Sequence, residues 1–413
     1  MTSTVSTYAD RPAAPYDVTD VALYADGDPL PVWRDLRATA PVHWNSTGIP
    51  GEEFWAVMTY DSAVQVYKDS TAFTSERGMR LGSTQHGVDA AAGKMLIVTD
   101  PPRHARLRQL MNSAFSPRRT AEMEQTMRDV LNPLIDDAFE RGVVDFVTDI
   151  AAVLPAAIVC HIMDVARDEH GAFTEMTSKA FGASLGEEGG PVTVAASARA
   201  NAKIFAYYAK LLKQRRAQPG NDVVSTLAHG EVDGVPLTDT EIIMNCNGIL
   251  LGANETTRLA SAGGLLALIE NPAEWQRLRD GVVSLDTAVE EILRYTSPAM
   301  HMKRVARIDT EVGDQYVKAG ETVAIWNPSA NRDEAVFDRP DTLDLARKPN
   351  RHLAFGTGSH FCIGAALARV ELRVMLQILV DRLSGAEIAG PVRRMRSNFM
   401  WGVERMPVTL LPQ

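Results

Sequence analysis

The sequence predicts a mainly α-helical protein that forms one large domain with a small β-sheet near its N-terminus. Residues 119–218 are nearly all helical in their apolar spacing, and a long apolar helix follows between Thr238 and Glu270. Two short apolar runs, 41–44 and 54–58, are typical of strands. The 413 residues contain no Gly/Ser-rich linker and no internal repeat. We therefore expect a single domain over residues 1–413, with residues 1–25 as a flexible N-terminal tail.

Charge and cysteine content exclude several classes of protein. A formal net charge of -10 argues against nucleic acid or an anionic membrane as the main partner. The polar N-terminal residues resemble neither a signal peptide nor a spanning helix. The three cysteines, Cys160, Cys246 and Cys362, are too few and too scattered for a disulfide framework. These features predict a cytoplasmic chain without membrane contact.

Residues 73–108 contain a long connection followed by the start of a helix. The connection, residues 73–99, has little periodicity, so it is either a binding loop or a surface excursion. The run Asp-Pro-Pro-Arg-His-Ala-Arg-Leu-Arg then begins at Asp100, and its proline pair favours a helix start. His104 and Arg108 lie four residues apart on one face of that helix. Without further context, this pair also fits a solvated basic face.

The region of residues 119–218 reads as several helices. An apolar stretch at 145–165 is interrupted by Pro155, and residues 196–212 carry an apolar stripe. Between them, the glycine-rich residues 182–190 indicate a break between two helices.

The long helix after residue 237 has clear start and stop signals. Thr238 and Glu241 form a capping box, and Asn271-Pro272 ends the helix. Its middle is almost wholly apolar, so the helix should be central and buried, and the polar residues 254–257 need a reason. We expect Thr256 to hydrogen-bond the carbonyl of Gly252 and bend the helix. An acid beside an alcohol, Glu255 with Thr256, can also orient water and pass protons, although an isolated pair fits a polar kink equally well.

Two motifs follow towards the C-terminus. Glu291 and Arg294 lie three apart on a helix, a pattern too common to mean much alone. The run Phe355-Gly-Thr-Gly-Ser-His-Phe-Cys-Ile-Gly364 places Cys362 where a helix begins, so the N–H groups of that first turn should favour its thiolate. A lone cysteine in a glycine-rich turn is usually structural or a weak nucleophile.

The full spacing F-G-x-G-x-H-x-C-x-G resembles the haem-ligand loop of the cytochrome P450 family. The resemblance extends over about residues 30–410 and implies the cytochrome P450 fold, a single large helical domain with small β-sheets. It implies haem b as cofactor, with Cys362 as the metal ligand and Phe355 and Gly356 in the haem-binding loop. The D-P-P-x-H-x-x-x-R segment implies that His104 and Arg108 bind haem propionates. Arg304, in an R-x-A pattern, and His352 match further propionate contacts.

The sequence departs from the family pattern at two places. The usual A-G-x-E/D-T reads Gly252-Ala253-Asn254-Glu255-Thr256, so a methyl group stands where the family leaves space near the oxygen site. The P-x-R-F stretch, which often supplies an arginine to the E-x-x-R pair, reads Pro340-Asp341-Thr342-Leu343.

The implied activity is that of an O2-dependent monooxygenase with Thr256 and Glu255 as catalytic residues. Such an enzyme inserts one oxygen atom of O2 into an unactivated C–H or C=C bond of a small organic molecule, here in secondary-metabolite biosynthesis. Because no flavin domain is fused, electrons should come from a ferredoxin-type partner with its reductase. A basic patch near the cysteine would steer that partner, or would be merely solvated; its residues are Arg103, Arg106, Arg347, Lys348, Arg351, Arg369 and Arg373.

Three alternatives remain open at this point. The same site can perform oxidative coupling or C–N bond formation on an amino-acid-derived or aromatic substrate. A catalytically silent haem-fold recruitment module is a second alternative, although such modules typically lack the cysteine or the acid–alcohol pair. A cysteine hydrolase using Cys362 with His360 is the third, with poorly placed partners. We expect substrate contacts from residues 73–99, 167–200, Asn247, Leu251, 299–302 and 399–401.

Overall fold

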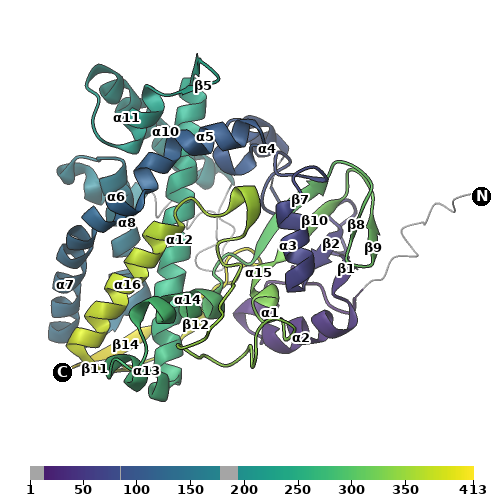
Figure 1. Cartoon of the computed structure of the whole chain (residues 1–413). Coiled ribbons are helices and arrows are strands. Elements are labelled where there is room, and N and C mark those ends of the chain that lie inside the picture. The colour runs from purple at the N-terminus through teal and green to yellow at the C-terminus, as the bar shows by residue number, and fades with distance from the viewer. Residues whose placement is uncertain (1–13, 84, 177–193) are drawn as a thin grey trace, which may run out of the picture.

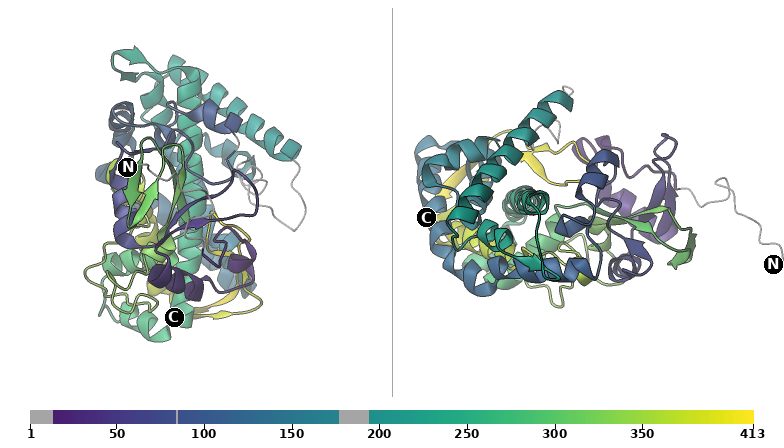
Figure 2. Two further views of the ribbon diagram at one scale, coloured as in Figure 1. Left: turned by 90° about the vertical axis from the view of Figure 1, so that its right-hand side faces the viewer. Right: turned by 90° about the horizontal axis from the view of Figure 1, so that it is seen from above.

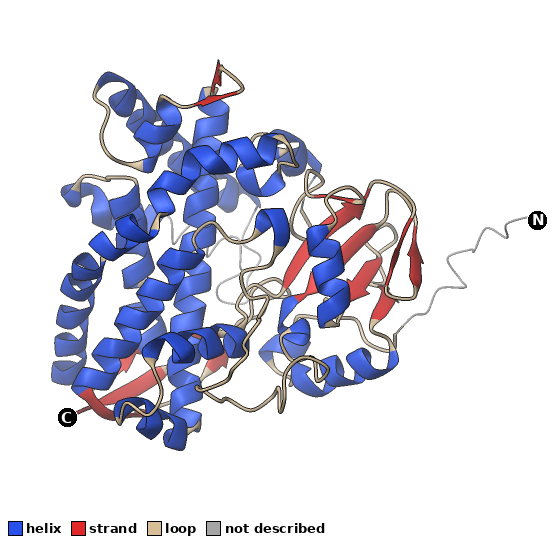
Figure 3. Cartoon of the chain, in the orientation of Figure 1, coloured by secondary structure: helices blue, strands red, loops and turns tan. Residues whose placement is uncertain are grey.

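The computed structural model describes residues 14–83, 85–176 and 194–413. Helices fill most of the molecule, and most strands gather at one side of it (Figures 1 and 3). Within the described ranges, no helix combines the length and the apolarity that a membrane span requires. The α-helices are α1 (Ala22–Ala25), α2 (Pro29–Thr39), α3 (Tyr60–Lys68), α4 (Gln85–Ala91), α5 (Arg103–Asn112), α6 (Pro117–Glu122), α7 (Glu124–Arg141), α8 (Val153–Ile162), α10 (Val194–Ala217), α11 (Val223–Ala228), α12 (Asp239–Glu270), α13 (Pro272–Arg279), α14 (Leu285–Thr296), α15 (Asn327–Ala330) and α16 (Ala365–Arg382).

The main sheet has five strands in the order β1-β2-β10-β7-β3. β1 and β2 are the two strands that the sequence predicts, and β10 runs parallel to β2. A three-stranded sheet, β11-β14-β4, lies near the C-terminal end of the chain. The strands are β1 (Val42–Asn45), β2 (Phe54–Val57), β3 (Phe73–Thr74), β4 (Val143–Asp145), β5 (Glu231–Val232), β6 (Val235–Pro236), β7 (His301–Ala306), β8 (Thr310–Val312), β9 (Gln315–Val317), β10 (Thr322–Trp326), β11 (Leu383–Ile388), β12 (Arg393–Arg394), β13 (Val403–Arg405) and β14 (Pro407–Pro412).

The expectation of a flexible N-terminal tail is wrong for residues 14–25, which pack against the fold. Residues 1–13 lie outside the described residues. Val18 and Tyr24 are fully buried, and the Tyr24 hydroxyl donates to the Val18 carbonyl at 2.7 Å. Both pack with Trp33 and Trp326 in one apolar cluster. Burial of these side chains fixes the segment against the main sheet.

Helix α12 stands at the centre of the helical part and is seen end-on in the right-hand view of Figure 2. Its predicted capping box is present, since Thr238 Oγ1 accepts from the Glu241 N–H and the Glu241 carboxylate accepts from the Thr238 N–H. Gly264 brings α12 close to α14, because a Cβ there would lie 2.9 Å from Ile292 Cγ2. The predicted ends and the predicted burial of this helix are confirmed.

The long connection of residues 73–99 is more ordered than its sequence suggests. It contains β3, the short helix α4 and a 3₁₀ turn at Leu96–Val98. The Leu96 N–H donates to Asn245 Oδ1 of α12 at 2.9 Å, and Met95 packs 3.3 Å from where a Cβ on Gly248 would stand. This end of the connection therefore covers α12 and is no surface excursion.

A buried ionic network on α14 holds the segment that leads to the cysteine loop. Glu291 and Arg294 are both fully buried and form two parallel hydrogen bonds of 2.8 Å. Arg347 Nε also reaches both carboxylate oxygens of Glu291, at 3.1 and 3.0 Å. Arg294 and Arg347 both donate to the carbonyl of Thr342, the residue that stands where the family often has its second arginine. Arg347 therefore supplies the second cation from a different position in the chain.

We predict that Glu291→Gln lowers the free energy of unfolding by about 3–5 kcal/mol, because it leaves two buried guanidiniums without their carboxylate. Glu122→Gln is the matched control, since Glu122 forms an exposed pair with Arg118 and its loss should cost less than about 1 kcal/mol. Urea unfolding of the three proteins measures both values. Equal decreases in the free energy of unfolding of the two variants would contradict the role of Glu291 at the centre of this buried network.

Candidate functional site

The cysteine loop, residues 355–364, folds back on itself and lies against α3. The Cys362 N–H donates to the Phe355 carbonyl at 2.9 Å, which closes the loop. Gly356 and Gly358 have φ of +63° and +75°, a left-handed conformation that favours glycine. A Cβ on Gly358 would also lie 2.8 Å from the Tyr67 carbonyl oxygen of α3, so no side chain fits there. The glycines of the motif are required by this turn and this close approach.

Cys362 lies three residues before α16 and is partly buried. Its sulfur accepts a hydrogen bond from the Gly364 N–H, and Arg108 and Arg369 place positive charge near it. Burial nevertheless outweighs these three groups and raises the pKa of the thiol. The expected N–H donor therefore does favour the thiolate, but its effect is smaller than that of burial. A metal ion bound to the sulfur would reverse this balance, because a coordinating thiol is deprotonated.

Three of the predicted cofactor-binding side chains gather beside this loop, together with a fourth that sequence reasoning missed. The rings of His104 and His360 lie 4.1 Å apart between centroids. Arg304 is 5% exposed and contributes to lowering the pKa of both histidines. Arg108 also lowers both pKa values and donates from Nη1 to the Phe361 carbonyl at 2.6 Å. His360 is the histidine of the F-G-x-G-x-H-x-C motif, so its place in the pattern was the available signal.

Among the described residues, Asp100 is the one carboxylate that acts on the cluster formed by His104, Arg108, Arg304 and His360, called here the cationic cluster. Burial, helped by the neighbouring cations, lowers the pKa of His104 to about 4 and of His360 to about 3. Burial also lowers the pKa of Arg108 and Arg304. The nearby carboxylate of Asp100 is already held by Thr74, the Ser75 N–H and Arg307.

Two carboxylates placed among these four groups would correct that imbalance. Buried cations are stable only when they are paired or strongly hydrogen-bonded, and arginine is suited to binding a carboxylate through two parallel bonds. The two propionates of a haem fit this need, and the sulfur of Cys362 lies on the same loop as His360. The residues present therefore fit a haem with a thiolate ligand.

His352 does not join the cationic cluster, so that expectation is wrong. Its Nε2 lies 3.3 Å from Glu290 Oε2, and its Nδ1 accepts from the Ala354 N–H at 3.2 Å. Burial alone would raise the pKa of Glu290, but hydrogen bonds from Arg369 and His352 lower it to about 2. His352 therefore ties the segment before the cysteine loop to α14.

Helix α12 presents an open patch in the middle of its otherwise buried length. Thr256 Oγ1 donates to the Gly252 carbonyl at 2.8 Å, which confirms the predicted back-bond. Leu251 is 41% exposed, and a Cβ on Gly252 would meet nothing within 4 Å. The methyl group of Ala253 packs against the main apolar core instead, so it leaves this patch free. A flat cofactor and a small ligand have room on this face.

Glu255 lies beside Thr256 but pairs with another residue. Its Oε2 lies 2.5 Å from Arg258 Nη2, and the carboxylate is buried. Any proton passed between the acid and the alcohol therefore needs a bridging water or a turn of the Glu255 side chain away from Arg258.

The other expected contacts are mixed. Asn247 and Met300 are buried, and the expected residues 177–193 lie outside the described residues. Ser75 Oγ lies 3.3 Å from His360 Nε2, which gives the histidine a partner other than the sulfur. The hydrolase reading of Cys362 with His360 therefore has no support from this geometry.

The expected basic patch is largely neutralised. Arg369 pairs with Glu290, Arg373 with Glu124, and Arg347 is buried against Glu291. Arg369 and Arg373 line a surface cavity of about 530 Å³ together with Glu124, Asp286 and Glu290. Arg103 and Arg106 pair with Glu241 and Asp233. Within the described part of the chain, only Lys348 and Arg351 of this set stay exposed and without an ion pair.

The fold and the cysteine loop together define a haem-thiolate class of protein, and comparison with known proteins names the family. The family model described as "Cytochrome P450" matches residues 194–401. Cytochrome P450 NovI of Streptomyces niveus is 36% identical over 394 residues, covering 95% of this chain and 96% of the relative. The steroid C26-monooxygenase of Mycobacterium tuberculosis strain H37Rv is 34% identical and covers 96% of this chain and 97% of its own length.

The solved structures agree with these relatives. The crystal structure of P450 OxyD, a protein involved in the biosynthesis of vancomycin-type antibiotics, matches with a TM-score of 0.88 at 35% identity. The match covers 96% of this chain and 100% of that chain. The chain belongs to the cytochrome P450 family. It is thus an oxidoreductase of the P450 monooxygenase class with the predicted fold, and membership implies a haem-thiolate cofactor.

We predict that the haem-free protein loses stability as the pH falls from about 6.5 towards 4. Unfolded His104 binds a proton near its ordinary pKa of about 6.5, whereas folded His104 binds one only near pH 4, so acid favours the unfolded state. In the variant His104→Gln, the free energy of unfolding should fall by roughly 2–3 kcal/mol less between pH 6.5 and pH 4. Urea unfolding at pH 7, 5.5 and 4 measures it. The exposed His229 supplies the control His229→Gln, and a slope that changes equally in both variants would refute this account.

Proposed function

We propose that this protein is a haem b monooxygenase that inserts one oxygen atom of O2 into an unactivated C–H or C=C bond of a small organic molecule. We place that reaction in secondary-metabolite biosynthesis in the cytoplasm. The observation that carries the proposal is the cationic cluster beside the Cys362 loop, which lacks the negative charge that two propionates supply. The open patch at Gly252 and Leu251 of α12 is a second observation in favour of the proposal.

In this proposal the chain divides the binding of haem among three elements. Cys362 would hold the iron of a bound haem through its sulfur, and the haem would supply the activation of O2. His104 and Arg108 from α5, Arg304 from β7 and His360 from the loop bind the propionates. Phe355 supports the loop from within, since the guanidinium carbon of Arg369 lies 4.7 Å from its ring centroid. Gly356 provides the turn that lets the loop pass beneath the cofactor.

Thr256 and Glu255 manage protons on the opposite side. The Thr256 hydroxyl is already committed to the Gly252 carbonyl, so its oxygen is free to accept a hydrogen bond from a water on the open patch. Glu255 stands next to it as a buried acid that pairs with Arg258. Together they hold an alcohol and a carboxylate at the face where oxygen is expected to react.

In this proposal, electrons come from a ferredoxin-type partner with its reductase. Because Arg369 and Arg373 already form ion pairs, they contribute little to the electrostatic attraction of an acidic partner to this face. Lys348 and Arg351 are the exposed cations that can still meet an acidic partner. Oxidative coupling or C–N bond formation on an aromatic or amino-acid-derived substrate is the second candidate, and the likeness to OxyD, a protein of antibiotic biosynthesis, supports a biosynthetic role for either reaction.

Cys362→Ser tests the axial ligand. The variant should lose the thiolate-type spectrum of the reduced carbon-monoxide complex, because a neutral hydroxyl does not donate charge to iron as a thiolate does. Cys160→Ser, at a buried cysteine on α8, should keep that spectrum. An unchanged spectrum in Cys362→Ser would place the ligand elsewhere.

Thr256→Ala tests the proton role. The variant should bind haem normally but form at least about tenfold less product per electron consumed, with the difference released as hydrogen peroxide. Turnover is measured with a surrogate ferredoxin and reductase on the compound that best displaces iron-bound water in a library screen. Thr257→Ala, at the buried neighbouring position, is the control. Fully coupled turnover by Thr256→Ala would reject the role.

A further inference from the structure

Arg80 lies in the connection between β3 and α4 and contacts the C-terminal turn that carries Phe399. Its guanidinium carbon lies 5.6 Å from the centroid of the Phe399 ring. Phe399 in turn packs against a small apolar cluster that includes Leu259 of α12, three residues after Thr256. The guanidinium of Arg80 therefore lies over the ring of Phe399, which itself packs against Leu259 of α12.

His301, at the start of β7, fixes this corner. Its Nε2 accepts from the Leu81 N–H at 3.0 Å, so Nδ1 carries the proton and donates to the Asn398 carbonyl at 3.0 Å. Its ring lies 5.2 Å from that of Phe399. Lys303, two residues further along β7, donates its N–H to the Met79 carbonyl at 2.8 Å. The Arg80 loop, β7 and the Phe399 turn are thus held together at one place.

This corner is positively charged, and no acid of the described ranges pairs with it. Arg80 and Lys303 are half-buried, and burial lowers the pKa of each. Among the described residues, neither side chain has an ion pair or a hydrogen-bond acceptor. Burial first, and then the charges of Arg80 and Lys303, lower the pKa of His301 to about 4 despite its bond to Asn398. No carboxylate contributes to any of these three shifts.

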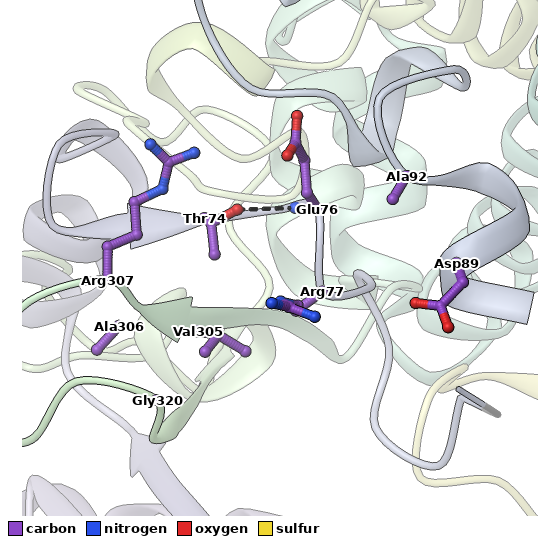
Figure 4. Close-up of a pocket in the computed structure, with 9 residues that line it drawn as sticks. All are labelled: Thr74, Glu76, Arg77, Asp89, Ala92, Val305, Ala306, Arg307 and Gly320. Carbon is purple, nitrogen blue, oxygen red and sulfur yellow. Dashed lines mark hydrogen bonds between the residues drawn. The ribbon is translucent and has the colours of Figure 1, made fainter. Parts of the chain in front are cut away.

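The neighbouring arginine of the same loop has a different setting. Arg77 lines a cavity of about 450 Å³ together with the acids Glu76 and Asp89 (Figure 4). Arg307 in that cavity pairs with Asp100. The cavity therefore carries both signs of charge and needs no anionic ligand, whereas the corner at Arg80 carries one sign only.

We propose that Arg80 binds a carboxylate of the substrate, with Lys303 adding positive charge and neutral His301 acting as a positioning residue. The inference rests on the proposed monooxygenase function and names the class of its substrate as an organic acid with an apolar body. A planar guanidinium matches a carboxylate through two parallel bonds, and these bonds are strong where water is partly excluded. A half-buried cation without a counter-ion is costly unless a ligand supplies one.

Matched pairs of probes test this inference with the haem-loaded protein. The probes are dodecanoate with its methyl ester, and biphenyl-4-carboxylate with its amide, titrated while the displacement of iron-bound water is followed in the absorption spectrum. Equilibrium dialysis gives the same dissociation constants independently of the iron. The acid of at least one pair should bind about 10-fold to 100-fold more tightly than its neutral partner.

Variants assign the effect to Arg80. Arg80→Gln should weaken the acid by about 10-fold to 100-fold and leave the neutral partner unchanged, whereas Arg77→Gln should change neither. Equal binding of acid and neutral partner in every pair, no binding of either acid, or an equal loss for both members in Arg80→Gln would each overturn the inference. The thiolate-type carbon-monoxide spectrum is recorded for every protein. Its presence without acid selectivity refutes only the Arg80 inference, whereas its absence in the wild-type protein refutes the proposed function.

Discussion

The buried carboxylate of Glu291 is the interaction on which the functional loop depends. It holds Arg294 and Arg347, and Arg294 also donates to the Asn331 carbonyl at 2.9 Å. Asn331 Oδ1 then accepts from the Leu353 N–H at 2.6 Å, two residues before Phe355. Hydrogen bonds thus run from α14 to the start of the cysteine loop. Because a buried charge without its partner is strongly destabilising, the position of the loop is tied to the stability of the whole fold.

Local charge matters more here than net charge. The chain carries a formal net charge of -10, but its interior holds two groups of cations without matching acids. One group surrounds the cysteine loop, and the other is Arg80 with Lys303. At the protein surface, by contrast, Arg369 and Arg373 near the loop are paired with acids. The positive charge that can bind ligands therefore lies inside the molecule, where the low dielectric constant strengthens each interaction.

Helix α12 joins the two groups. The back-bond of Thr256 and the bare Gly252 lie on its open face, while Leu259 supports the turn that carries Phe399. A substrate on this face would lie between the haem iron, which acts on one carbon, and Arg80, which would hold the other end. Distance between the two would then decide which carbon reacts.

The sequence by itself determined the features that depend on neighbours along the chain. The capping box of α12, its end at Asn271 and the back-bond of Thr256 follow from residues three or four apart, and the glycines of the cysteine loop follow from one tight turn. Tertiary structure alone decided the contacts between distant segments. Arg347 replaced the arginine missing at Thr342, His352 turned to Glu290, His360 joined His104, and Arg80 was left without an acid. The reason is physical: a hydrogen bond within one helical turn is set by local spacing, whereas the partner of a buried charge is set by which segments pack around it.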